Sequence, residues 1–307
     1  MDPYVDIAIG STIKGLRVSS GISQKELSEG VCTQSLISQI ESGNNIPNSI
    51  LLKQIAEKLG ITLDGLLLMS EYPKFDHFVE VESKLIKLIE SNNYKQALEM
   101  IEYEKENVSS KNGKVKQFFL WAEGVCQYYL NNNFVLAMDL LKEALSASSN
   151  LVFSYQDAKI LNSQGILYAQ EKLLEESVET FKIILATNKK LSPYVVSLSP
   201  LLPKVYYNLS KVFTIQGYYE ESIEYCQEGI KYSKNMESIA DLGELFFQIG
   251  INYEKLEKYN ESLIWLTKSQ DIFELKVSDY ELLSVITNKI HEVNTLLSER
   301  LNHQFNR

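Results

Sequence analysis

The chain has 307 residues, of which 45% are hydrophobic and 23% charged, and 40 acidic side chains against 30 Lys and Arg give a net charge of −10. This apolar content excludes a disordered chain, and the length predicts two domains, or one small domain followed by a longer array. Three Cys exclude a disulfide framework and no stretch approaches the ~18 apolar residues of a membrane span, so we expect a cytoplasmic protein with no membrane contact.

The first 70 residues are predicted to form five short helices, because glycine and proline divide them into pieces of about 6 to 13 residues. Apolar residues recur at helical spacing within the pieces, as Ile9, Ile13 and Leu16 do in the first. The expected helices span residues 7–19, 23–29, 34–42, a segment after Pro47, and 63–68. They make one compact domain over residues 1–70.

Capping residues mark where the second and third of these helices begin. Ser23, with Glu26 three residues later, is a capping box, and Thr33 is a good N-cap. Gly43 ends the third helix, since the residue after a helix end often has a positive φ. The second and third helices are therefore joined by a short turn.

An internal repeat of about 40 residues occupies the rest of the chain. A small residue recurs at intervals of 40, 40, 45 and 40 residues, with a large anchor three positions before it and an apolar or aromatic residue nine before it. The small residue lets two helices approach closely, and the aromatic fills the gap between neighbouring hairpins. The small residues are Ala97, Ala137, Ser177, Ser222 and Ser262, and the anchors are Tyr94, Phe134, Leu174, Tyr219 and Tyr259.

This spacing resembles the tetratricopeptide repeat, lengthened from ~34 to ~40 residues per unit. Five copies are expected over residues 75–275, with a capping helix over 279–300 and a loop from Ser192 to Pro203 between the third and fourth copies. The resemblance implies a right-handed superhelix whose concave face is built mainly by the first helix of each hairpin. The predicted fold is all-α, a five-helix domain over 1–70 followed by a repeat domain over 71–307.

The string from Ser23 to Gly43, SQKELSEGVCTQSLISQIESG, resembles the helix-turn-helix of the lambda-repressor-like class. Such a module places its second motif helix in the major groove, where Gln pairs with adenine and Ser with several bases. The start of the preceding helix suits phosphate contacts. These arguments select Gln24, Lys25, Thr33, Gln34, Ser35, Ser38, Gln39 and Asn44 for DNA binding.

Internal roles compete with DNA contacts in this domain. Capping accounts for Thr33 without DNA. Arg17 either binds phosphate or pairs with Glu41, and the resemblance to the lambda-repressor-like class implies the pair, because the matching Arg and Glu usually bind each other in that class. Residues 1–70 carry five basic and seven acidic side chains, a net charge of −2 that departs from the usual basic footprint. One copy should therefore bind DNA weakly, and a homodimer should be needed on two half-sites of a pseudo-palindromic operator.

The whole chain resembles the cytoplasmic peptide-pheromone receptors of Gram-positive bacteria, within them the PlcR-like group, through Cys32-x-Gln34-Ser35-x-x-Ser38-x-Ile40-Glu41-Ser42-Gly43. The resemblance implies a homodimeric transcriptional regulator of quorum sensing, whose concave groove binds a short signalling peptide. Asn would hydrogen-bond an extended peptide, Lys would take a carboxylate and aromatics would supply apolar pockets. Positions expected to be exposed on the first helices of repeats three to five select Lys159, Asn162, Lys204, Tyr207, Asn208, Lys211, Phe247 and Gln248.

An enzyme, a cofactor or a metal site is not expected. The sequence has no Walker loop, dinucleotide motif or metalloprotease motif, and its three His lack ligand spacing. Cys126 and Cys226 fall at apolar positions and should be buried, whereas Cys32 lies in the motif turn. Two alternatives remain: a helix-turn-helix regulator whose repeats bind a protein partner or report redox state, and an interaction scaffold that does not bind DNA.

Overall fold

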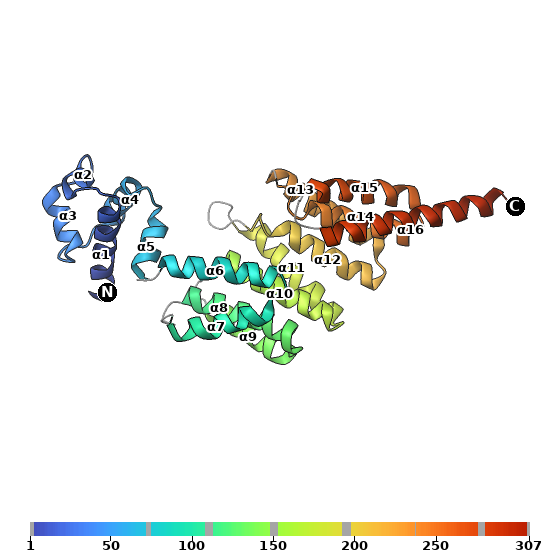
Figure 1. Cartoon of the computed structure of the whole chain (residues 1–307), viewed down its shortest axis with the longest axis horizontal. Helices are drawn as coiled ribbons and strands as arrows, with labels where there is room; N and C mark the ends of the chain where they lie inside the picture. The colour runs from blue at the N-terminus through green and yellow to red at the C-terminus, as the bar shows by residue number, and fades with distance from the viewer. Residues whose placement is uncertain are drawn as a thin grey trace. The chain divides into compact units, whose positions relative to one another are not determined.

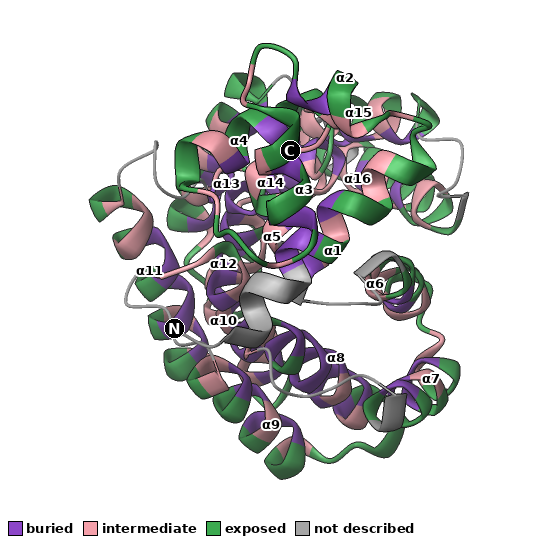
Figure 2. Cartoon of the chain, turned by 90° about the vertical axis from the view of Figure 1, so that its left-hand side faces the viewer, coloured by how far each residue is buried: buried purple, intermediate pink, exposed green. Residues whose placement is uncertain are grey.

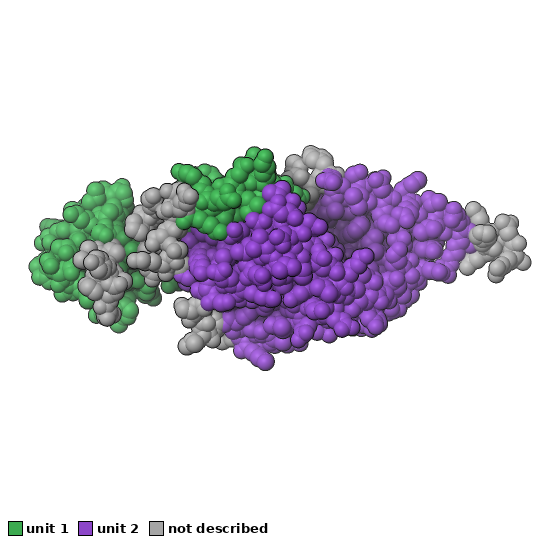
Figure 3. Space-filling view, turned by 90° about the horizontal axis from the view of Figure 1, so that it is seen from below, with its two compact units in different colours: residues 1–112 green, residues 113–307 purple. Residues whose placement is uncertain are grey.

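The computed structural model describes residues 3–71, 75–107, 113–147, 153–191, 198–236, 238–275 and 280–305, and every regular element in these ranges is an α-helix (Figure 1). The chain forms two compact units, residues 1–112 and 113–307, which Figure 3 shows in different colours. The first unit contains α1 (Pro3–Ser19), α2 (Gln24–Ser28), α3 (Gln34–Glu41), α4 (Ser49–Lys58), α5 (Leu63–Glu71), α6 (Phe75–Glu90) and α7 (Tyr94–Asn107). The second contains α8 (Gly113–Asn131), α9 (Phe134–Ala147), α10 (Tyr155–Gln170), α11 (Leu174–Lys190), α12 (Leu202–Gln216), α13 (Tyr219–Asn235), α14 (Leu242–Lys255), α15 (Tyr259–Leu275) and α16 (Tyr280–Phe305).

The helices α1 to α5 enclose one apolar core, as the sequence predicted. One side chain or more from each helix is buried in it, among them Ile13, Leu27, Ile37, Ile55 and Leu66. The first and last helices are longer than predicted, since α1 begins at residue 3 and α5 continues to residue 71.

The predicted caps are confirmed. Ser23 and Glu26 form a capping box at the start of α2, and the Thr33 hydroxyl accepts a hydrogen bond from the Leu36 backbone N–H at the start of α3. Gly43 has φ 74°, the left-handed conformation that ends a helix at little cost for glycine.

A buried ion pair joins α1 to the end of α3, which confirms the predicted pairing of Arg17 with Glu41. The Arg17 Nε and Nη2 atoms donate to the two carboxylate oxygens of Glu41 at 2.6 and 2.9 Å, and Nη1 donates to the Ile22 carbonyl at 2.8 Å. The two side chains are 12% and 3% exposed. Burial alone would raise the pKa of Glu41, but hydrogen bonds from Arg17 and Gln24 and the charge of Arg17 hold it below its ordinary value.

Five helix hairpins follow, α6–α7 in the first unit and α8–α9, α10–α11, α12–α13 and α14–α15 in the second. The small residue of each hairpin is fully buried, at 0% exposure in all five cases. In the last three hairpins its hydroxyl also donates to a backbone carbonyl twelve residues earlier on the partner helix. These bonds join Ser177 to Gly165, Ser222 to Ser210 and Ser262 to Gly250, at 2.7, 2.7 and 2.8 Å. The close contact that the repeat predicted is thus reinforced by a hydrogen bond in these three hairpins.

Figure 2 shows buried residues along the length of α8.

Each hairpin turn contains one residue in the left-handed conformation, five positions before the small residue. These residues are Asn92, Asn132, Lys172, Gly217 and Glu257, with φ of 58°, 51°, 63°, 86° and 56°. Asn and Gly adopt this conformation readily, whereas a long side chain does so at a cost of about 1 kcal/mol. The turns therefore share one geometry although their sequences differ.

The aromatic anchor fills the space between neighbouring hairpins, as predicted, where Phe134 lies between two tyrosines. Its ring centre is 6.4 Å from that of Tyr128 in the same hairpin and 6.1 Å from that of Tyr168 in the next. Glycine adds to the close packing, because a Cβ atom on Gly165 would lie 2.7 Å from the Phe181 ring.

The last helix, α16, is tied to the fifth hairpin, which confirms the predicted capping helix. Lys289 lies 3.4 Å from the carboxylate of Glu254 on α14, and Arg300 Nη1 donates to the Glu257 carbonyl at 2.6 Å. The predicted proline-rich loop is shorter than expected, because Pro203 lies in the first turn of α12. Proline is tolerated there, since the backbone N–H that it lacks would have no hydrogen-bond partner within the helix. Residues 192–197 of that loop lie outside the described residues.

Replacement of Glu41 by Gln should destabilise the helices α1 to α5 by about 3 kcal/mol at neutral pH, because it leaves a buried guanidinium without its counter-charge. The folded-state pKa of Glu41 is below its ordinary value of 4.5, so this stabilisation is present above that pH and lost as the pH falls through the folded pKa. The difference between wild type and variant should therefore shrink as the pH is lowered below 4.5.

Urea unfolding can test this in the intact chain. The two Trp residues, 121 and 265, are in the second unit, so their fluorescence reports the unfolding of that unit, whereas circular dichroism reports the helices of both units. Glu41→Gln should shift the dichroism transition and leave the fluorescence transition in place. The control is Glu57→Gln, which removes an exposed pair with Lys53 and should change stability by less than about 1 kcal/mol. Equal effects of the two variants would contradict the prediction.

Candidate functional site

The outer face of α3 presents the polar side chains that the sequence selected. Gln34, Ser35, Ser38 and Gln39 are exposed, whereas Ile37 and Ile40 of the same helix are buried. Thr33 is exposed at the helix start, but its hydroxyl accepts the capping hydrogen bond. Lys25 and Asn44 are also exposed.

This face has no uncompensated negative charge, although the domain as a whole is acidic. Between residues 33 and 45 the sequence contains one acid, Glu41, and that carboxylate is buried and paired with Arg17. The first turn of α3 contains no acidic residue, so no carboxylate there neutralises the partial positive charge of the helix N-terminus. The local electrostatics of this face therefore suit an anionic partner better than the net charge suggests.

A chain of hydrogen bonds connects the ion pair to the exposed face, which sequence reasoning did not anticipate. Gln24 Nε2 donates to the second carboxylate oxygen of Glu41 at 2.8 Å, and Gln34 Nε2 donates to Gln24 Oε1 at 2.7 Å. Gln24, expected as a phosphate contact, is half-buried and held within the domain. The result is that the side-chain orientation of Gln34 is fixed by a network that ends at a buried charge.

The residues selected for peptide binding lie on α10, α12 and α14, but not all are exposed as expected. Asn162 and Gln248 are buried, at 5% and 6% exposure. Lys204 and Lys211 are exposed, and Tyr207, Asn208 and Phe247 are half-buried. Lys159 is half-buried, and its ammonium lies 3.9 Å from the centre of the Trp121 ring, a cation–π contact.

The expectation that Asn162 and Gln248 are exposed was wrong because each amide bonds to the neighbouring first helix. Asn208 Nδ2 on α12 donates to Asn162 Oδ1 on α10 at 3.0 Å, and Gln248 Nε2 on α14 donates to Thr214 Oγ1 on α12 at 2.7 Å. These bonds join consecutive hairpins.

A further amide in this region, Asn252, was missed. It is fully buried, accepts a hydrogen bond from Thr214 at 2.6 Å and donates to Ser222 at 2.7 Å. The repeat register contains the signal that could have found it, because the equivalent positions in the two preceding hairpins are the buried apolar residues Leu167 and Val212.

A pocket of about 310 Å³ lies between α10 and α12 at the start of α11. Of the eight residues selected for peptide binding, Asn208 and Lys211 line it, and Asn162 is bonded to Asn208. The lining residues are Ile166, Ala169, Gln170, Lys172, Leu174, Phe181, Asn208, Lys211, Val212 and Ile215. The pocket combines apolar surface with two lysines and contains no carboxylate.

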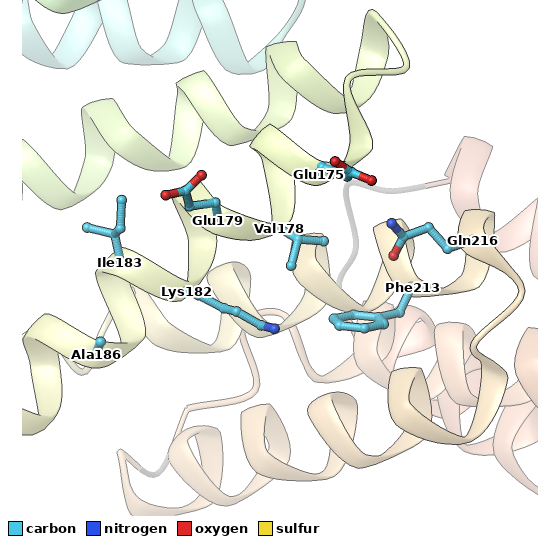
Figure 4. Close-up of a pocket in the computed structure, with 8 residues that line it drawn as sticks. All are labelled: Glu175, Val178, Glu179, Lys182, Ile183, Ala186, Phe213 and Gln216. Atoms are coloured by element: carbon cyan, nitrogen blue, oxygen red, sulfur yellow. The ribbon is translucent and has the colours of Figure 1, made fainter.

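A second, more open pocket of about 510 Å³ runs along α11 to the end of α12 (Figure 4). Val178 and Phe213 supply apolar surface, Glu175 and Glu179 lie on α11, and Lys182 extends towards Phe213 with its ammonium 5.7 Å from the ring centre. None of the residues selected from the sequence lines this pocket.

A metal site, a membrane-spanning helix or a reactive cysteine would each indicate a different function. The described residues contain no group of three or more His, Cys, Asp or Glu that could hold a metal ion, and no described helix is long and apolar enough to cross a membrane. Cys126 and Cys226 are buried, and burial raises the pKa of each thiol to about 12. Cys32 is half-buried, and burial raises its pKa as well.

Two family profiles match the chain, one described as the RNPP family C-terminal domain over residues 82–291 and one as helix-turn-helix over residues 13–66. No curated protein sequence matches it. Among solved structures, Bacillus thuringiensis PlcR in complex with the peptide PapR7 and DNA is similar at 27% identity and a TM-score of 0.80, over 92% of this chain and 99% of that one.

Two further structures extend the comparison. The apo form of Bacillus thuringiensis PlcR is 25% identical with a TM-score of 0.66, over 92% of this chain and 99% of that one. The pheromone receptor Rgg2 of Streptococcus dysgalactiae, at 14% identity and a TM-score of 0.60 over 92% and 99%, shares the fold. The family and the fold are those of transcriptional regulators and not of enzymes. With a helix-turn-helix domain at its N-terminus and a C-terminal-domain profile that covers more than half of its length, the chain belongs to the RNPP family.

Proposed function

We propose that this protein is a cytoplasmic, sequence-specific DNA-binding transcriptional regulator, active as a homodimer and controlled by a short signalling peptide bound in the concave groove of its repeats. The observation that carries the proposal is the similarity, over 92% of the chain, to a PlcR structure that contains both a peptide and DNA. The arrangement of polar groups in both units supports it.

On the DNA side, Gln34 is the residue best placed to read a base. It lies exposed on α3, and its bond to Gln24 holds the amide in one orientation, which lowers the entropy lost on binding. A Gln amide can pair bidentately with adenine in the major groove. Ser35, Ser38 and Gln39 extend the same surface, and Lys25 supplies a phosphate contact.

A dimer follows from the small size of this surface. The first 70 residues have a net charge of −2, so electrostatic attraction to phosphate contributes little to the affinity of one copy. Two copies on half-sites about 34 Å apart would combine their affinities. Peptide binding changes DNA affinity if the peptide prefers one of two arrangements of the dimer.

On the peptide side, the support is the set of amide and lysine side chains between α10 and α12. Asn208 and Asn162 bond to each other in the structure, and an extended peptide backbone offers a donor and an acceptor that could replace this bond. The redox alternative has little support from the cysteines, because Cys126 and Cys226 are buried thiols of raised pKa.

Gln34→Ala should lower specific DNA affinity by about 1–3 kcal/mol and relax discrimination at one base pair of each half-site. Fluorescence anisotropy on DNA from the protein's own genomic neighbourhood, at several salt concentrations, would measure it. The matched control is Gln54→Ala, which removes an exposed amide from α4. Unchanged specific affinity in Gln34→Ala would remove Gln34 from the interface, and the absence of specific binding by wild type on a wide operator set would favour the scaffold alternative.

Asn208→Ala should abolish the response of DNA affinity to peptide while leaving affinity without peptide unchanged. The same anisotropy assay would be run with and without an oligopeptide fraction from the spent medium of the source culture. The control is Asn260→Ala, an exposed amide on α15. Wild-type DNA binding that is specific but ignores every peptide fraction would support the alternative in which the repeats bind a protein partner.

A further inference from the structure

The pocket between α10 and α12 contains a charged residue at a position that is otherwise apolar in the repeats. Lys211 lies eleven residues before the small residue of its hairpin, and the equivalent positions in the other four hairpins are Ile86, Cys126, Ile166 and Ile251. The packing of the hairpin therefore does not require a lysine there.

The surroundings of Lys211 leave its charge without a carboxylate. It belongs to no ion pair among the described residues, and its ammonium lies 5.4 Å from the centre of the Tyr207 ring. Although the Lys211 residue as a whole is exposed, desolvation of its ammonium lowers the pKa of this group. An anion brought into the pocket would relieve this electrostatic penalty.

A second lysine lies at the edge of the same pocket. Lys172 is the left-handed residue of its hairpin turn, with φ 63°, at the position that Asn occupies in two other hairpins, Gly in one and Glu257 in the fifth. Lys172 and Lys211 thus make the pocket cationic in a chain whose net charge is −10.

The rest of the lining is apolar. Ile166 on α10 and Val212 and Ile215 on α12 line the pocket, together with the fully buried ring of Phe181 on α11. The volume of about 310 Å³ is sufficient for one large side chain with the backbone beside it. Apolar walls with a few placed polar groups are typical of ligand sites.

From this arrangement we propose that the pocket selects a peptide in which a carboxylate adjoins a bulky apolar side chain, the carboxylate binding Lys211 and Lys172 and the apolar side chain lying against Ile166, Val212 and Ile215. This inference rests on the proposed function and specifies the chemistry of its ligand. The carboxylate can be that of Asp or Glu, or that of the peptide C-terminus, and the experiment separates these sources.

The test is affinity selection on the full-length protein with two synthetic pools of random linear heptapeptides, one with a free C-terminus and one amidated. Mass spectrometry identifies the retained peptides. If the pocket binds the carboxylate of an Asp or Glu side chain, the peptides that wild type retains from both pools should be enriched in a bulky apolar residue next to Asp or Glu. Enrichment in the free pool alone, with the apolar residue at the end, would identify the terminal carboxylate.

Two variants make the assignment specific to the pocket. Lys211→Ile, which installs the residue found in three other hairpins, should weaken the preference for the carboxylate, since Lys172 remains, and keep the preference for the apolar residue. Lys234→Gln, an exposed lysine on α13, is the control and should select as wild type does. Thermal unfolding of each variant confirms that it is folded.

Titration calorimetry then compares two peptides on wild type and on Lys211→Ile. One is the best retained peptide, and the other is the same peptide with the bound carboxylate replaced by an amide. Loss of the carboxylate should weaken binding to wild type about tenfold or more, since a hydrogen bond to a charged group contributes about 1.5–3 kcal/mol, and should weaken binding to Lys211→Ile by a clearly smaller factor. Retained peptides without acid enrichment, or the same enrichment with Lys211→Ile, would overturn this inference and leave peptide control intact. No peptide retained from either pool would overturn the inference and argue against peptide control as well.

Discussion

The close approach of two helices at one small residue per hairpin is the constraint on which the repeat region depends. Ala97, Ala137, Ser177, Ser222 and Ser262 are all fully buried at this contact, and each of the three serines also bonds to a carbonyl of the partner helix. A larger side chain here would separate the helices and displace the aromatic anchors from the next hairpin. Within the second unit, the first helices α8, α10, α12 and α14 lie next to one another in this order, and the pocket between α10 and α12 results from that arrangement.

Between the first helices, polar side chains bind neighbouring hairpins to each other. Asn208 with Asn162, and Thr214 with Gln248 and Asn252, are bonds across successive hairpins. Buried amides satisfied in this way specify one arrangement, because a shift of one hairpin against the next would leave each of them unpaired. A ligand that replaces one of these bonds changes the contact between two hairpins directly, so binding and hairpin arrangement are physically coupled.

The sequence was sufficient for the features that depend on local chemistry and periodicity. Helix spacing predicted the short helices, capping residues predicted where α2 and α3 begin, and the 40-residue period predicted five hairpins and a final helix. The pairing of Arg17 with Glu41 was predicted from the resemblance. Features that depend on the distance between neighbouring hairpins were not predictable, since the period says which side of a helix a residue occupies but not whether its side chain reaches the next helix. For this reason the helical period predicts exposed side chains for Asn162 and Gln248, which are buried, and predicts neither the buried amide of Asn252 nor the bond between Gln24 and Gln34.

The chain of bonds from Arg17 through Glu41 and Gln24 to Gln34 has a consequence for how such a regulator diverges. A change of Gln34 alone removes the hydrogen-bond donor of the Gln24 amide oxygen. A change of Gln24 alone removes one of the hydrogen bonds that the Glu41 carboxylate accepts. Single substitutions along this chain therefore carry a penalty that a second substitution can remove. New operator preferences should accordingly arise by paired replacements at positions 24 and 34, with the salt bridge beneath them retained as the fixed end of the chain.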